Sequence, residues 1–168
     1  MQFATERLLV DEWHSLDSTQ WASQDAVAAV QEILTPQVTQ CLPPAWQGRY
    51  TRQRAAQWLS ERDKEGSTYL IVSKSDKQAI GFLILSGHEH GPHLRLGYLL
   101  KEPAWGHGYA SELVRGVVKR SRENGVQTLT GGIASGNTGS QRVLAKCGFH
   151  ITGDEPVADQ LSYTIRLA

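Results

Sequence analysis

The sequence predicts an α/β (α+β) fold, and three segments carry this prediction. Residues 94–100 form an apolar run with the length and composition of a buried strand. Residues 110–122 then place apolar side chains at helical spacing on one side and charged side chains on the other. The apolar run 128–133 is typical of a further strand. Strands and helices therefore follow one another along this part of the chain.

The composition predicts one domain that spans residues 1–168 and is long enough to bury a core. The 17 basic residues balance the 17 acidic residues, which favours neither nucleic acid nor an anionic membrane as a partner. The N-terminus has no signal-peptide pattern, and no apolar run approaches the roughly 20 residues of a membrane span. We therefore expect a cytoplasmic protein. Cys41 and Cys147 lack metal-site spacing and are expected to be reduced thiols without a role.

The N-terminal part predicts a strand followed by a helix. Residues 4–10 are typical of a strand. Asp17 and Ser18 offer N-cap chemistry for a helix whose apolar residues recur at helical spacing over 26–34. Pro36 is expected to end this helix.

The next segment, 39–50, has no hydrophobic period and is predicted to be a loop that carries aromatic side chains. Two interpretations stay open for Trp13, Trp46 and Tyr50, which either pack in the core or line a substrate pocket.

A second helix and two strands are predicted next. Thr51 is expected to cap a helix that has Ala55, Trp58 and Leu59 on one face and ends near Gly66. The strands are predicted over 69–73 and 79–86, with a polar hairpin connection at 74–77.

Residues 87–93 contain three histidines and one glutamate between glycines. A zinc site is disfavoured, because His88 and His90 would point to opposite faces of an extended segment and no cysteine or second carboxylate joins them. We expect no metal here. An exposed hairpin turn and a source of acid or base groups near an acceptor are the two interpretations that remain.

The C-terminal part predicts two helix ends with recognisable caps. Asn124–Gly125 is a natural C-cap for the helix that begins near residue 110. Asn137 is expected to cap a short helix that closes at Gly148–Phe149 in a Schellman motif. The final strands are predicted over 150–153 and 160–167.

The glycines between the strand 94–100 and the following helix predict an anion-binding turn. A helix start presents unpaired N–H groups and a positive dipole end, and Gly106 and Gly108 allow both positive φ and the close approach of a phosphate. Tyr109–Ala110 follows the second glycine where a Walker loop needs Lys-Ser or Lys-Thr. Ser111 stands where a dinucleotide fingerprint needs its third glycine. A diphosphate of another kind is therefore the expected ligand.

Three motifs together resemble the GNAT N-acetyltransferases. Trp-Gly-x-Gly-Tyr-Ala-x-Glu at 105–112 resembles their acetyl-coenzyme A motif, in the variant of the ribosomal-protein N-terminal (alanine/serine) acetyltransferases. Asn-x-x-Ser-x-x-Val-Leu-x-Lys-x-Gly-Phe at 137–149 and Thr-Glu-Arg-Leu-Leu at 5–9 are similar to segments of the same branch. The resemblance covers nearly the whole chain and implies a single GNAT domain. It also implies a mixed, mostly antiparallel central sheet of six to seven strands flanked by helices.

The resemblance implies a binding site for acetyl-coenzyme A, with no metal. In this family the strands 96–100 and 128–133 splay apart and the pantetheine arm pairs with the exposed backbone. A main-chain N–H near Leu99 or Leu100 would polarise the thioester carbonyl. Asn137 is implied to contact the pantetheine or a water, and Arg142 the other end of the ligand. The backbone amides implied to hold the diphosphate belong to Trp105, Gly106, His107, Gly108, Tyr109 and Ala110.

The resemblance implies fewer of the catalytic residues than of the residues that bind acetyl-coenzyme A. Ser140 resembles the hydroxyl beside the leaving sulfur and, with Asn137, is a candidate catalytic residue. Many relatives place a tyrosine acid where this chain has Leu144, and a glutamate base where it has Arg95. The substitutes for that base are histidines or a glutamate in one hairpin: His88, Glu89, His90 and His93.

These features predict an N-acetyltransferase that moves an acetyl group from acetyl-coenzyme A to a primary amine, with a protein or peptide N-terminus as the leading acceptor. A small amine such as a polyamine, an amino acid or an aminoglycoside is the alternative acceptor. A non-catalytic coenzyme A-binding regulatory module is a rival that Arg95 and Leu144 motivate. The sequence leaves a homodimer open.

Overall fold

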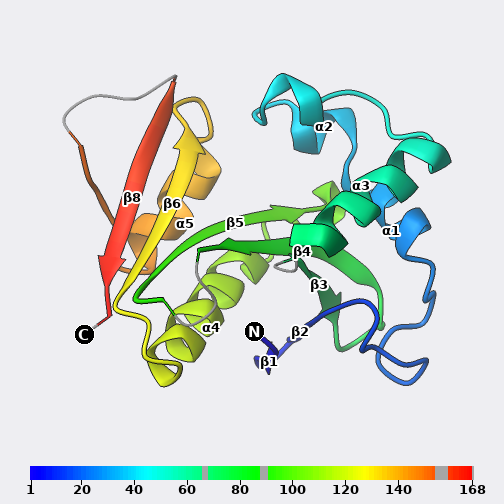
Figure 1. The fold of residues 1–168 in the computed structure, drawn as a ribbon, viewed down its shortest axis with the longest axis horizontal. Helices are drawn as coiled ribbons and strands as arrows, with labels where there is room; N and C mark the ends of the chain where they lie inside the picture. The colour runs from blue at the N-terminus through cyan, green and yellow to red at the C-terminus, as the bar shows by residue number, and fades with distance from the viewer. Residues whose placement is uncertain (66–67, 88–90, 154–158, 168) are drawn as a thin grey trace. The chain divides into compact units, whose positions relative to one another are not determined.

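The computed structural model describes residues 1–65, 68–87, 91–153 and 159–167 (Figure 1). The chain divides into two compact units, and the strands β4 and β5 contribute residues to both. The first unit comprises Met1–Ile84 and Tyr98–His107, and the second comprises Leu85–Gly97 and Gly108–Ala168. In the described ranges no helix has both the length and the apolar character that crossing a membrane requires.

The sheet of the first unit is built by hairpins. Strand β2 pairs antiparallel with β1 and with β3, and β3 pairs antiparallel with β4. All six residues of β3 are buried, as its continuous apolar sequence predicts. The strands that belong wholly or partly to this unit are β1 (Phe3–Ala4), β2 (Leu8–Asp11), β3 (Thr68–Ser73), β4 (Ala79–Ser86) and β5 (His93–Leu100).

Two capped helices pack together in this unit. In α1 (Ala26–Ile33) the carboxylate of Asp25 accepts a hydrogen bond from the Ala28 amide at 3.0 Å, and this bond lowers the pKa of Asp25. In α3 (Arg52–Glu65) the Thr51 hydroxyl accepts from the Arg54 amide at 3.2 Å, which confirms the predicted cap. Shorter helical turns occur at α2 (Pro36–Thr39), Pro44–Trp46 and Glu102–Ala104.

Trp13, Trp46 and Tyr50 of this unit pack in its core. Trp13 and Tyr50 are buried, and the half-buried Trp46 packs edge-on against Trp58 with ring centroids 5.6 Å apart. Trp58 in turn lies 4.9 Å from the ring of Phe82. Core packing is therefore the interpretation that the structure supports for the aromatic residues of the first 50 positions.

The second unit is centred on β6 (Thr128–Ala134). This strand pairs along its whole length with β8 (Gln160–Arg166), which also pairs with β7 (His150–Ile151). Figure 1 shows β6 and β8 side by side. On the other edge of β6, β5 runs parallel for only three residue pairs, from His93↔Thr128 to Arg95↔Thr130.

Helices α4 (Tyr109–Glu123) and α5 (Thr138–Lys146) belong to the second unit and contact each other. The face of α4 predicted to be apolar is buried, with Leu113, Val114, Val117 and Val118 in the core. Asn124 caps the helix and Gly125 follows at φ 76°, as predicted.

Helix α5 ends in the predicted Schellman motif. The Phe149 amide donates to the Leu144 carbonyl at 3.0 Å, and the Gly148 amide donates to the Ala145 carbonyl at 3.1 Å. Gly148 has φ 89°, the left-handed conformation that this motif requires.

The α/β prediction is confirmed, but the described residues form eight strands, in the order β1-β2-β3-β4-β5-β6-β8-β7, rather than six to seven. The predicted strand 4–10 is two short strands, because the Thr5 amide turns back to the Leu8 carbonyl at 2.9 Å. The described pairs other than β5–β6 are antiparallel.

One predicted helix boundary in the first unit is wrong. Asp17 does not cap α1, because its carboxylate accepts from the Thr19 amide at 2.8 Å and closes a separate turn. The helix ends at Ile33, before Pro36 as predicted, and Pro36 begins α2, where proline suits the first position.

Gly81 of β4 leads to a stability prediction. A Cβ at this position would lie 2.1 Å from the Leu99 carbonyl oxygen and 2.7 Å from Leu100 Cδ2, whereas a Cβ at Gly97 would meet nothing within 4 Å. Gly81→Ala should therefore cost about 1–3 kcal/mol of unfolding free energy. For a chain of this size, each kcal/mol lowers Tm by about 2–4 °C. Gly97→Ala is the matched control, and equal Tm values for the two variants would contradict the described packing of β4 against β5.

Candidate active site

The loop after β5 is held by its own side chains and backbone. The Lys101 amide donates to the Ile80 carbonyl at 2.9 Å and fixes the start of the loop. The Trp105 indole N–H donates to the Leu100 carbonyl at 2.7 Å, although the Trp105 side chain is 46% exposed. The indole N–H of Trp105 thus stabilises the loop, while part of its ring is exposed to solvent.

Two glycines with positive φ turn this loop into α4. Gly106 has φ 76° and Gly108 has φ 80°, both in the left-handed region. Gly108 is the N-cap of α4 and makes no side-chain cap, so it supplies no acceptor to the amides of the first turn. A Cβ at Gly106 would meet nothing within 4 Å. This turn has the open backbone and the helix-dipole end that an anion requires.

A long-range contact reaches the same turn. The Arg7 guanidinium donates to the His107 carbonyl at 2.9 Å, across 100 positions of the sequence. The backbone of Arg7 is fixed in turn, because its carbonyl accepts from the Lys74 amide at 2.9 Å. The sequence predicts only a strand over 4–10 here and does not reveal this contact, since nothing local relates Arg7 to His107.

The end of β5 carries the residues predicted to face the thioester. Leu99 and Leu100 are both buried, and the Leu100 carbonyl is the acceptor of the Trp105 indole. Apolar side chains and a carbonyl oxygen cannot donate a hydrogen bond, so a donor to the thioester from this segment would be a main-chain N–H. That role of Leu99 or Leu100 stays a prediction.

Arg95 stands where its strand stops pairing with β6. The pairing of β5 with β6 ends at Arg95↔Thr130. A Cβ at Gly132 would lie 2.5 Å from a guanidinium nitrogen of Arg95, so this side chain lies against the backbone of β6. Arg95 therefore brings a positive charge to this part of the sheet.

Helix α5 positions the candidate catalytic hydroxyl. Asn137 is the N-cap of α5, and its side-chain oxygen accepts from the Ser140 amide at 3.1 Å. The cap thus fixes the first turn, which includes the half-buried Ser140. Leu144 is 1% exposed and packs toward Gly131, so its position supplies core packing and no acid. Arg142 is exposed on the second turn.

The predicted base candidates are only partly placed. His88, Glu89 and His90 lie outside the described residues, so their roles stay predictions. His93 is the exposed first residue of β5. In the described ranges, no three His, Cys, Asp or Glu side chains are grouped so that they could hold a metal ion.

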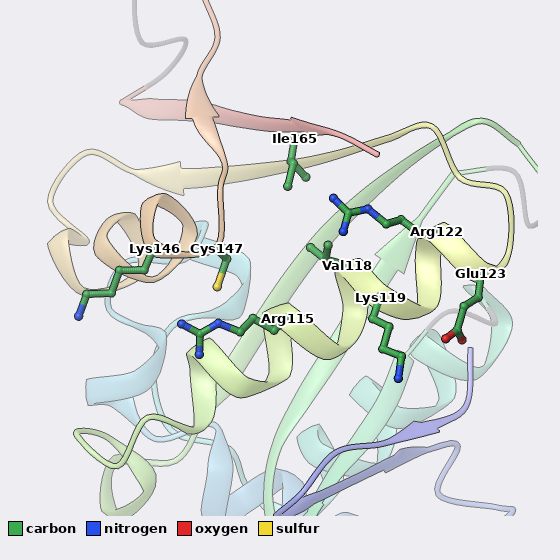
Figure 2. A pocket seen from close by; sticks show the side chains of 8 residues that line it. All are labelled: Arg115, Val118, Lys119, Arg122, Glu123, Lys146, Cys147 and Ile165. Atoms are coloured by element: carbon green, nitrogen blue, oxygen red, sulfur yellow. The ribbon is translucent and has the colours of Figure 1, made fainter. Parts of the chain in front are cut away.

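A hollow of about 440 Å³ lies between α4, α5 and β8 within the second unit (Figure 2). Four basic side chains line it. Two of them, Arg122 and Lys146, lie in the last turns of α4 and α5, where positive charge complements the helix dipole. None of the residues predicted for the site belongs to its lining, which consists of Arg115, Val118, Lys119, Arg122, Glu123, Lys146, Cys147 and Ile165.

Cys147 forms part of this lining as a structural thiol. It is free, and its Sγ donates weakly to the Ser111 carbonyl at 3.6 Å. Burial raises the pKa of the Cys147 thiol, an effect that the nearby Arg115 charge opposes in part. The thiol is therefore protonated at neutral pH and is a poor nucleophile.

Solved structures confirm the fold. An acetyltransferase of the GNAT family from Bacillus anthracis is 18% identical and matches with a TM-score of 0.80, covering 99% of each chain. Ribosomal-protein-alanine N-acetyltransferase from Brucella melitensis is 21% identical, with a TM-score of 0.62 over 84% of this chain and 94% of that one. RimL, a ribosomal L7/L12 α-N-protein acetyltransferase in complex with coenzyme A, is 15% identical, with a TM-score of 0.72 over 99% and 98%.

The sequence itself matches a family model. A comparison with curated proteins finds no match. The model of the acetyltransferase (GNAT) domain, however, matches residues 18–150, which is more than half of the chain. This match and the described fold agree with the motifs at 105–112 and 137–149. The chain therefore belongs to the GNAT acetyltransferase family.

Proposed function

We propose that the chain transfers an acetyl group from acetyl-coenzyme A to a primary amine, most simply the N-terminus of a protein or peptide. The observation that carries the proposal is the turn into α4, in which Gly106 and Gly108 both have positive φ and Gly108 leaves the helix start without a side-chain cap. A solved neighbour supports the donor, since the structure of RimL is a complex with coenzyme A.

The residues present at the turn fit a diphosphate. Without a Cβ, Gly106 leaves open space beside the main chain, and the first amides of α4 point along the positive end of the helix dipole. Trp105, His107, Tyr109 and Ala110 would contribute backbone rather than side chains, which is why their identities matter less than the two glycines. Acetyl-coenzyme A would supply the acetyl group as a thioester.

The chain's own groups would serve the departing thiolate and the developing oxyanion. When the C–N bond to the neutral amine forms and the C–S bond breaks, the sulfur gains negative charge and can take a proton from a hydroxyl; the nitrogen releases its own proton to solvent, and the hydroxyl regains one from solvent. Ser140 is our candidate for this donor, because the Asn137 cap holds the turn that carries it. Leu99 or Leu100 would offer a main-chain N–H to the carbonyl oxygen.

An N-terminal acceptor suits a site that has a cation where relatives carry a carboxylate. An α-amino group has a pKa of about 7.7–8.0 and is partly neutral at pH 7.5, whereas a lysine-like amine near 10.4 is almost wholly charged. A nearby positive charge at Arg95 lowers an amine's pKa further. The balanced total charge also gives no general attraction for a polycationic amine.

Exchange of Gly108 for valine should remove coenzyme A binding. Its side chain would occupy the path of the phosphate, whereas Gly125→Val, with a similar φ of 76° at the other end of α4, imposes the same backbone strain away from the turn. Wild type and Gly125→Val should gain about 2.7 kcal/mol of stability at a hundredfold excess of coenzyme A over Kd, measured as a rise in Tm. An equal rise in Gly108→Val would rule out the turn as the diphosphate site.

Removal of the Ser140 hydroxyl should lower kcat about tenfold to a thousandfold, with little change in the KM for acetyl-coenzyme A. Thr138→Ala, which removes an exposed hydroxyl from the same turn, is the control and should keep wild-type kcat. Asn137→Ala should instead cost about 1 kcal/mol of stability through the lost cap. A normal kcat in Ser140→Ala would leave both residues with a structural role only.

A further inference from the structure

We propose that Arg7 is a positioning residue for the glycine turn, and that its guanidinium sets the direction in which the Gly108 amide points. The Arg7 Nη1 atom donates to the His107 carbonyl at 2.9 Å. This inference rests on the proposed function in one respect, namely that the amide so directed is one that binds the diphosphate of coenzyme A.

The geometry of one peptide bond links the two groups. The peptide between His107 and Gly108 is planar and trans, so its C=O and N–H bonds point in opposite directions. A donor that holds the carbonyl oxygen on one side therefore holds the N–H on the other. Arg7 lies on the carbonyl side, and the Gly108 N–H is thereby directed away from the Arg7 side chain.

A peptide in this position needs such a support. Gly106 and Gly108 on either side of His107 have φ of 76° and 80°, and glycine also populates negative φ readily. Rotation of the peptide would exchange the N–H for the carbonyl oxygen, which repels phosphate. The bond from Arg7 selects one of these two orientations.

The support is anchored at both ends. On the Arg7 side, the Arg7 carbonyl accepts from the Lys74 amide, and the next residue, Leu8, is fully buried. On the loop side, the Trp105 indole holds the Leu100 carbonyl at 2.7 Å. Between these two anchored ends, the segment 106–108 contains both glycines with positive φ.

The hydrogen bond from Arg7 to the His107 carbonyl is exposed, so its loss should affect the orientation of the peptide more than the stability of the fold. An exposed hydrogen bond of this kind contributes at most about 0.5–1.5 kcal/mol to folding. Arg7 can therefore be replaced with the fold intact. Arginine suits the task because its side chain is long and always charged, with several N–H donors in a rigid plane.

The first test uses the ligand-free protein and amide resonances of ¹⁵N-labelled protein. Arg7→Met keeps an unbranched apolar stem and removes the donor; Arg49→Met removes an exposed cation of the same unit and is the control. Arg7→Met should shift the Gly108 resonance and raise its hydrogen-exchange rate about tenfold, since a local opening becomes easier. Arg49→Met should change neither. An unchanged Gly108 resonance and exchange rate in Arg7→Met would overturn the proposal whether or not coenzyme A binds.

The second test measures the Kd of coenzyme A by calorimetry in low salt and in 1 M salt. Arg7→Met should bind about tenfold more weakly than wild type and Arg49→Met, as expected when a charge-assisted bond that orients a donor is lost. The ratio should persist in 1 M salt, where a Debye length of about 3 Å removes long-range attraction. Arg7→Lys, which retains a cationic N–H donor group, should restore most of the affinity together with the Gly108 resonance.

Two results of the second test would overturn the proposal. Equal affinity in Arg7→Met and wild type would show that the peptide needs no support. A loss that disappears in 1 M salt would assign Arg7 a simple charge effect. If wild type itself fails to bind coenzyme A, the proposed function fails, while the ligand-free measurement still decides the role of Arg7.

Discussion

The positive φ angles of Gly106 and Gly108 are the constraint on which the functional interpretation depends. They let the chain leave β5, turn within a few residues and start α4 without a side-chain cap. Two side chains contact backbone carbonyls near the turn: the Trp105 indole donates to Leu100 and the Arg7 guanidinium donates to His107. These side chains help to fix the path of the loop, and the proposed diphosphate site uses its backbone.

Helix α5, which carries the candidate Ser140, begins with a side-chain cap, unlike α4. Asn137 caps α5 with its own side chain, which accepts from the Ser140 amide of the first turn. The α4 start is uncapped and the α5 start is capped, which separates the proposed diphosphate site from the proposed proton donor. At the other end of α5, the Schellman motif at Gly148 and the buried Leu144 hold the helix in place.

Local chemistry in the sequence predicted much of this structure. The caps at Asn137 and Thr51 and the left-handed Gly148 are each specified within a few residues, and each was confirmed. The assignment of Asp17 as the cap of α1 failed because a carboxylate before a helix can equally close a turn of its own. Sequence could show the residue type there but not which amide it would bond.

Non-local contacts could not be predicted. The bond from Arg7 to the His107 carbonyl joins positions 100 residues apart, and the position of Arg95 against β6 depends on where the β5–β6 pairing ends. Neither is encoded in a local period or motif. The hydrophobic patterns established the strands and helices, and tertiary packing then determined which polar side chains reach the turn.

An acceptor panel tests the central claim of acetyl transfer to an N-terminal amine most directly. Free thiol released from acetyl-coenzyme A would be measured with a peptide that has a free N-terminus and no lysine, the same peptide with a blocked N-terminus and one lysine, and spermidine. The account predicts release with the first peptide, and a rate that rises with the neutral fraction of an amine of pKa about 7.7–8.0. Release with spermidine alone would contradict the proposed acceptor, and no release with any amine by a protein that binds coenzyme A would contradict catalysis itself.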